Sequence, residues 1–141
     1  MYDLERFLKA QESMYEIALT EIKKGHKFSH WIWYIFQQLK ILGRSKTAVY
    51  YGIENLDEAK EYLEDEILRA RLLEISQALL ELATNDPVAV MGHIDSVKLR
   101  SCMTLFHLAD PTCEIFKKVL DKYFSGQLDE LTVELCKAEH D

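Results

Sequence analysis

The apolar residues of this chain recur every three or four positions, and no stretch alternates apolar and polar side chains as a half-buried strand does. This spacing places side chains on one face of a helix and therefore predicts helices throughout. Neither a Gly/Ser linker nor an internal repeat divides the 141 residues. The pattern predicts an all-α fold, in one compact domain over residues 1–141 with seven to nine helices, several of them short. The stripe of the first helix comprises Leu4, Phe7, Leu8, Gln11, Tyr15, Ala18, Leu19 and Ile22.

Capping residues indicate where these helices begin and end. Both prolines, Pro87 and Pro111, follow an aspartate, and Asp–Pro favours a helix start because the carboxylate accepts amide hydrogen bonds that proline does not need. Gly25 and Gly126 follow apolar stripes and predict helix ends. We expect helices over residues 3–24, 30–39, 45–52, 57–64, 65–83, 86–92, 97–109, 112–125 and 128–137. Their expected caps are Asp3, Ser45, Asn55 or Asp57, Asp65, Asp86, Asp95 or Ser96, and Asp110.

Composition narrows the class of protein. The formal net charge is −7, which argues against binding nucleic acid over the whole surface, because a polyanion needs a cationic footprint. The three cysteines form no Cys-x-x-Cys pair, so neither a disulfide framework nor a zinc ribbon is expected and a reducing compartment is indicated. The opening MYDLERFLKAQ lacks the features of a signal peptide, and no apolar run approaches the roughly 20 residues that span a bilayer. We expect a cytoplasmic protein that binds neither nucleic acid nor membrane.

The densest aromatic stretch is SHWIWYIF, from Ser29 to Phe36. As a helix it is apolar nearly all round, which is typical of a buried helix. We therefore expect most of its side chains in the core, on a short central helix. His30 and Trp33 share a separate face, and their N–H groups need partners when buried. These two residues are the candidates in this stretch for lining a pocket.

Four further side chains could complete such a pocket. Gln11 lies on an apolar stripe, where a buried amide bonds either to the protein itself or to a ligand. Arg44, Lys98 and Arg100 are cations in a loop or near a helix start, where the helix dipole favours an anion. For each cation the alternative is a solvated charge or a salt bridge. The candidate set is Gln11, His30, Trp33, Arg44, Lys98 and Arg100.

No known catalytic or cofactor-binding pattern appears. The five glycines are scattered singly, which excludes a P-loop and a dinucleotide-binding loop. The histidines lack metal-ligand spacing, and Cys102 lies among apolar neighbours, which indicates a buried thiol rather than a nucleophile. We therefore predict no metal and no cofactor, assign no catalytic residue and leave open whether the protein is an enzyme.

Several motifs carry a family resemblance. GHKFSHWIWYIFQQLKILGRS and the later VKLRSCMTLF, with the opening FLKAQESMYEIALTEIKKG, resemble the bacterial DUF1810 family, also called Rv1873-like. The resemblance implies a small fold of irregularly packed helices with some armadillo-type stacking, and no established activity. The family usually has proline where this chain has Gln37, and without that proline the His30 helix is expected to continue a residue or two.

Two functions remain open after these observations. The favoured one is a small soluble helical binding or interaction protein, with a protein partner or a second copy as its target. The alternative is a small-molecule site, with or without catalysis, for an anionic, nucleotide-like ligand between the His30 helix and the Lys98–Ser101 helix start. Fold alone does not decide between them.

Overall fold

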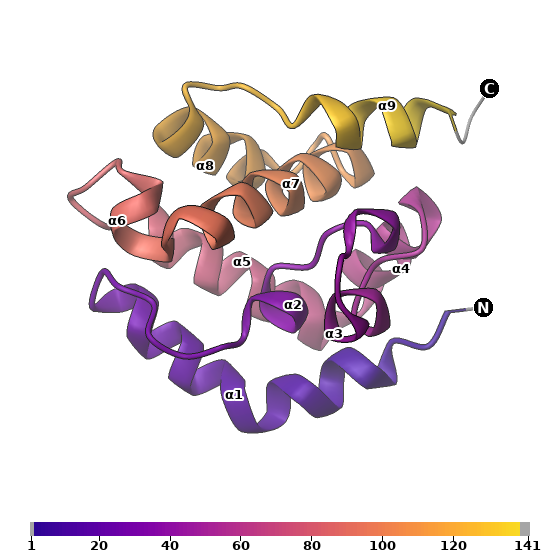
Figure 1. The fold of residues 1–141 in the computed structure, drawn as a ribbon, viewed down its shortest axis with the longest axis horizontal. Coiled ribbons are helices and arrows are strands. Elements are labelled where there is room, and N and C mark those ends of the chain that lie inside the picture. Colours follow the sequence, from indigo (N-terminus) through magenta and orange to yellow (C-terminus); the bar gives the residue numbers. More distant parts are fainter. Residues whose placement is uncertain (1, 139–141) are drawn as a thin grey trace.

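Two long helices, α5 and α7, organise the molecule (Figure 1). The structure is a computed structural model that describes residues 2–138. Helix α7 packs against α4, α6, α8 and α9, and α5 packs against α1, α4 and α8. Within the described residues there are nine α-helices and one short 3-10 helix, which confirms the predicted all-α fold. They are α1 Glu5–Lys23, α2 Ile32–Ile35, η1 Lys40–Leu42, α3 Lys46–Tyr50, α4 Leu56–Glu64, α5 Glu66–Leu80, α6 Pro87–Met91, α7 His93–Ala109, α8 Glu114–Phe124 and α9 Glu130–Ala138.

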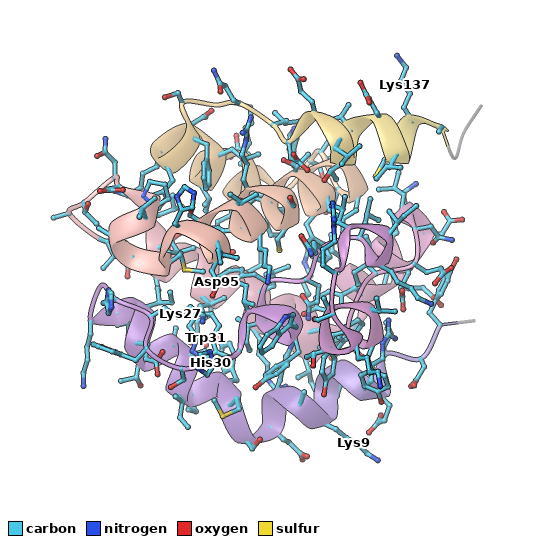
Figure 2. The ribbon with its side chains drawn as sticks, in the orientation of Figure 1. Lys9, Lys27, His30, Trp31, Asp95 and Lys137 are labelled. Carbon is cyan, nitrogen blue, oxygen red and sulfur yellow. The ribbon has the colours of Figure 1, made fainter. Side chains whose placement is uncertain are left out.

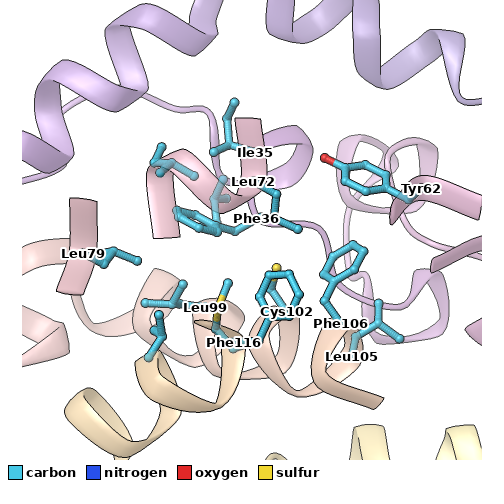
Figure 3. Packing of buried hydrophobic residues seen from close by; sticks show 14 of the residues in the cluster. Ile35, Phe36, Tyr62, Leu72, Leu79, Leu99, Cys102, Leu105, Phe106 and Phe116 are labelled. Carbon is cyan, nitrogen blue, oxygen red and sulfur yellow. The ribbon is translucent and has the colours of Figure 1, made fainter. Parts of the chain in front are cut away.

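Four side chains of the aromatic stretch lie in the core, whereas Tyr34, which was also predicted to be core, and Trp33 are half-buried. Trp31 is fully buried, and Ile35 and Phe36 are at most 2% exposed. Figure 3 shows Ile35 and Phe36 beside Leu72 of α5. Burying such side chains contributes roughly 1.5–3 kcal/mol each, so this short segment supplies several kcal/mol of the core's stabilisation.

Local capping chemistry sets most helix starts where the sequence predicts them. Ser45 accepts a hydrogen bond from the amide of Ala48, and Asn55, rather than Asp57, caps α4. Asp65 and Asp86 cap α5 and α6 through their carboxylates. These contacts join residues two or three positions apart, which is why the sequence alone reveals them.

The predicted helix over residues 30–39 is wrong. It is a single turn, α2, and Phe36 leaves helical geometry at φ −120° and ψ 78°. The chain then pairs with a distant segment, because the Ile53 amide donates to the Gln38 carbonyl and the Lys40 amide donates to the Ile53 carbonyl. Gly52 permits this approach, since a Cβ there would lie 2.3 Å from the Lys40 Cα.

Three other predicted helix starts are also wrong. Helix α1 begins at Glu5 after Leu4, which makes no side-chain cap, rather than directly after Asp3. Helix α7 begins at His93, after Gly92 with φ 86°, rather than after Asp95 or Ser96. Helix α8 begins after Cys113 rather than at the Asp110–Pro111 pair, because the Asp110 carboxylate accepts hydrogen bonds from Thr112 and closes a turn before the helix. Lys98–Ser101, predicted to lie at a helix start, therefore lies beyond the first turn of α7. The backbone amides at this position are paired within the helix and cannot bind an anion.

Residues 2–138 contain no helix with both the length and the apolarity that crossing a membrane requires.

Candidate functional site

The region between α2 and α7, where a nucleotide-like ligand was predicted, is filled by side chains. Lys98 Nζ lies 5.7 Å from the centre of the half-buried Trp33 ring and 3.9 Å from an Asp95 carboxylate oxygen. The cavity beside Trp33 and Lys98 measures about 10 Å³, far below the roughly 300 Å³ at which ligand sites begin. His30 is exposed in the bend before α2 (Figure 2). A nucleotide has no room at this position.

Gln11 is buried and fully bonded within the protein. Its Nε2 donates to the Tyr34 carbonyl at 2.7 Å and to the Tyr62 hydroxyl at 3.0 Å. Its Oε1 accepts a hydrogen bond from Arg71 at 3.3 Å. Of the two roles expected for Gln11, the structure therefore shows hydrogen bonding to the protein itself, because both polar atoms of the amide already have protein partners.

Arg100 is also engaged by the protein's own backbone. Its guanidinium donates to the Gln127 carbonyl at 3.0 Å and to the Leu128 carbonyl at 2.7 Å. Arg100 therefore holds the connection between α8 and α9 against α7, away from Trp33 and Gln11.

A second buried amide provides a matched comparison with Gln11. Gln37 also donates to the Tyr34 carbonyl at 2.7 Å, but its Oε1 has no hydrogen-bond partner within residues 2–138. We expect Gln11→Met to lower the free energy of unfolding by about 2 kcal/mol, because it removes the hydrogen bonds of Gln11 to Tyr34, Tyr62 and Arg71. Gln37→Met is expected to change it by less than about 1 kcal/mol, because it also removes an unsatisfied carbonyl. Urea unfolding of both variants measures the difference, and equal losses would contradict this account.

Arg44 lies apart from the other five candidates, on an open cleft near the start of the chain. We call this the N-terminal cleft; it has a volume of about 1030 Å³. Its walls are the N-terminal segment, the turn between η1 and α3, α3 itself and the approach to α4. The lining residues are Tyr2, Asp3, Arg6, Lys40, Gly43, Arg44, Ser45, Lys46, Val49, Tyr50, Gly52, Glu54 and Glu58.

An ion pair forms the floor of the N-terminal cleft. Arg6 lies 3.1 Å from the carboxylate of Glu58, whose side chain is only 2% exposed. The same guanidinium donates to the carbonyls of Tyr50 and Gly52, both at 2.9 Å. Because its donors are used in this way, Arg6 shapes the cleft and does not act as a free cation in it.

The rim of the cleft carries the available positive charge. Arg44 and Lys46 are exposed, and the side chain of neither makes a hydrogen bond or ion pair within residues 2–138. Lys40 pairs with Glu54 at 3.4 Å, with both side chains about half exposed, so water screens the pair strongly. Tyr50 adds an aromatic ring that is 59% exposed. The rim can therefore offer two unpaired cations and an aromatic surface.

Arg44, Lys46 and Lys40 belong to one long segment without acidic residues, here called the acid-free segment. Residues 22–53 contain six Lys or Arg and no Asp or Glu, in a chain that has 24 acidic residues. The uneven distribution of charge along the chain is not visible from single cations, but it is visible when the charges of the whole segment are counted. It is the sequence signal that could have located the cleft.

Three polar side chains of α1 hold the acid-free segment along that helix. Glu21 bonds to the loop before α2, Gln11 to the end of α2, and Arg6 to the end of α3. The segment therefore runs back along α1, from the end of that helix to its start (Figure 1). This arrangement carries its last part, with Arg44 and Lys46, to the N-terminal cleft.

Glu21 is the most strongly bonded of the three anchors. Its carboxylate accepts from the amides of Phe28 and Ser29 at 2.8 and 2.9 Å, from the Ser29 hydroxyl at 2.5 Å and from the Trp31 indole at 2.9 Å. Burial alone would raise the pKa of Glu21, but these hydrogen bonds together outweigh it and lower the pKa to about 2. Nearby, Lys27 pairs with Asp95 at 2.8 Å and lies over the Trp31 ring (Figure 2).

Across residues 2–138, no group of three or more His, Cys, Asp or Glu side chains is placed to hold a metal ion.

Comparison with known proteins gives two matches. A family model described as "Protein of unknown function (DUF1810)" matches residues 1–136. The crystal structure of the conserved hypothetical protein Rv1873 from Mycobacterium tuberculosis is similar to this chain, with 38% sequence identity and a TM-score of 0.94. That similarity covers 96% of this chain and 97% of the other. No curated protein matches. Neither match names a ligand, a reaction or a partner.

Proposed function

This chain belongs to the DUF1810 family, whose function is unknown, and we propose that it is a binding protein whose N-terminal cleft holds an anionic ligand. The observation that carries the proposal is the position of Arg44 and Lys46, two exposed cations without protein partners, on the rim of a cleft of about 1030 Å³. Within residues 2–138, six of the 17 Lys and Arg side chains form ion pairs, so an unpaired surface cation is not by itself unusual. Arg44 and Lys46 differ from the other unpaired cations because they lie together on one concave surface, and this placement favours an anion.

The floor of the cleft supports the same proposal. The ion pair of Arg6 and Glu58 and the backbone contacts of Arg6 fix the cleft's shape before any ligand arrives. A site whose side chains are already held in place binds a ligand more tightly, because less free energy is spent on ordering those side chains.

A thermal-shift screen tests the proposal. We expect at least one compound among nucleotides, sugar phosphates and dicarboxylates to raise the melting temperature. A ligand present at 100 times its Kd adds about 2.7 kcal/mol of stability, which such a screen detects. The shift should disappear in the Arg44→Ala/Lys46→Ala variant, because the rim then has no unpaired cation.

Lys137 provides the matched control. It is an exposed cation near the end of α9, away from the cleft (Figure 2). Lys137→Ala should keep the full shift. A ligand that binds the double variant as tightly as the unchanged protein would place the site elsewhere and overturn the proposal.

We also propose a cytoplasmic location. Cys102 is fully buried, and burial raises the pKa of its thiol, so it is a packing residue suited to a reducing compartment. Fractionation of the producing cells should find the protein in the cytoplasm, and recovery from outside that compartment would contradict this.

A further inference from the structure

We infer that the occupant of the N-terminal cleft is an acidic peptide segment of a partner protein, one that carries Asp or Glu beside an aromatic or aliphatic side chain. This inference rests on the proposed function and specifies the class of ligand. It assigns Arg44 and Lys46 to the partner's carboxylates and Tyr50 to its apolar side chain.

Charge complementarity is the first argument. The wall of the cleft formed by residues 40–52 contains three cations and no acidic residue. Arg44 and Lys46 are unpaired there, and Lys40 holds Glu54 only through a half-exposed contact of 3.4 Å. A carboxylate of a partner can replace Glu54 at little cost, because exposed ion pairs contribute only about 0–1 kcal/mol.

Exposed apolar surface on the same wall is the second argument. Tyr50 is 59% exposed and Val49 is 39% exposed, and both line the cleft. Ile41, on the adjacent η1 turn, is 73% exposed. Tyrosine and arginine are the side chains that most often anchor protein interfaces. A small phosphorylated metabolite needs the cations but leaves this apolar surface unused.

The construction of the cleft is the third argument. Its volume of about 1030 Å³ lies at the upper limit for small-molecule sites, which enclose most of their ligand. The guanidinium of Arg6, which could have clamped a phosphate, is instead bonded to Glu58 and to two carbonyls. Positive charge is left only along the rim, where an extended chain with spaced carboxylates can reach it.

Binding of a fluorescein-labelled octapeptide library tests the inference. In the library, Asp or Glu alternates with Tyr, Phe, Leu or Val; a matched library has Asn and Gln in place of the acids. We expect fluorescence anisotropy to show saturable binding of acidic peptides and at least tenfold weaker binding of the matched peptides. Raising NaCl from 50 to 300 mM should weaken binding, because the charges involved lie at an exposed rim.

Three exposed positions give the informative variants. Arg44→Ala/Lys46→Ala and, separately, Tyr50→Ala should each weaken the best peptide at least tenfold, whereas Lys137→Ala should leave it unchanged. A Tyr50→Ala variant that binds as well as the unchanged protein would overturn the peptide assignment, since the apolar contact would be missing. Melting temperatures of all variants show whether the fold is retained.

The failure of this inference can be told apart from failure of the proposed function. If no peptide saturates but a phosphorylated compound from the thermal-shift screen binds in an Arg44-dependent way, the cleft is an anion site and the peptide inference is overturned. If neither class of ligand binds, both statements are overturned.

Discussion

Glu21→Ala is expected to lower the free energy of unfolding by about 3 kcal/mol, although the residue touches neither the cleft nor any ligand. The carboxylate accepts hydrogen bonds from Phe28, Ser29 and Trp31, and the Trp31 ring is fully buried. Removing the acceptor leaves the indole N–H without a partner, and each stranded buried donor costs about 1–3 kcal/mol. Hydrogen bonds to a charged acceptor are also stronger than neutral ones. Chemical denaturation measures the loss.

Glu12→Ala is the control for that variant. Glu12 lies on the same helix and is exposed, so its replacement should change stability by less than about 0.5 kcal/mol. If both alanine variants were equally stable, Glu21 would not anchor the acid-free segment.

The low pKa of Glu21 predicts a particular dependence on pH. Its folded pKa is about 2, below the ordinary value of 4.5, so its stabilising contribution is fully present above pH 4.5 and is lost as the pH falls toward 2. The full shift of the Glu21 pKa, from 4.5 to about 2, corresponds to about 3 kcal/mol. Glu21→Gln cannot ionise, so its stability deficit relative to the unchanged protein should be constant above pH 5 and shrink between pH 4.5 and 2. A deficit that stays constant down to pH 2.5 would show that the carboxylate charge contributes nothing.

Arg6→Ala is expected to have the second large effect, again about 3 kcal/mol. It leaves the buried Glu58 carboxylate without its cation and removes the hydrogen bonds to Tyr50 and Gly52. An uncompensated buried charge costs roughly 3–5 kcal/mol, and part of this is relieved here because Glu58 still accepts from the Glu54 amide at 2.6 Å. Thermal or urea unfolding measures the loss.

Two further variants separate the ion pair from simple packing. Arg6→Leu/Glu58→Leu should be more stable than Arg6→Ala, because neither charge is then left buried alone. Lys9→Ala, an exposed position one turn further along α1 (Figure 2), should be close to neutral. If the double variant were less stable than Arg6→Ala, the main effect of Arg6 would not be to compensate the buried charge of Glu58.

Helix starts at Ser45, Asp65 and Asp86 were predictable because a cap acts on amides two or three residues away. The burial of Trp31 and Phe36 was predictable because a stretch that is apolar on nearly every side is typical of the core. Motif resemblance predicted the family, and the match over residues 1–136 confirms it.

The end of α2 was not predictable from neighbouring residues. The helix stops at Ile35 because the chain that follows pairs with Ile53, and that contact closes only in the folded molecule. The absence of proline at Gln37 therefore did not extend the helix. The Gln37 side chain instead donates to the Tyr34 carbonyl, an acceptor that a continuing helix would have used.

Of the six candidate residues, Arg44 is the one that lines the N-terminal cleft. Arg100 and Gln11 are bonded to partners 23 to 60 positions away in the chain, so their structural roles were invisible to an argument from spacing. Arg6 was missed for the same reason, since it bonds to residues 44 and 46 positions away. Glu21 was missed because its partners, 7 to 10 positions away, lie beyond the end of its own helix. The absence of acidic residues between Ile22 and Ile53 was a usable signal, because charge asymmetry needs no knowledge of contacts.

The most direct test of the N-terminal cleft is an NMR titration of the ¹⁵N-labelled protein with pyrophosphate and, separately, with the best-binding acidic peptide. At least one of these anions should shift the amide signals of residues 43–50 and of the first turn of α1, in a saturable way that is lost in Arg44→Ala/Lys46→Ala. Shifts centred instead on Trp33 and Lys98, or no saturable shift with either anion, would contradict the account.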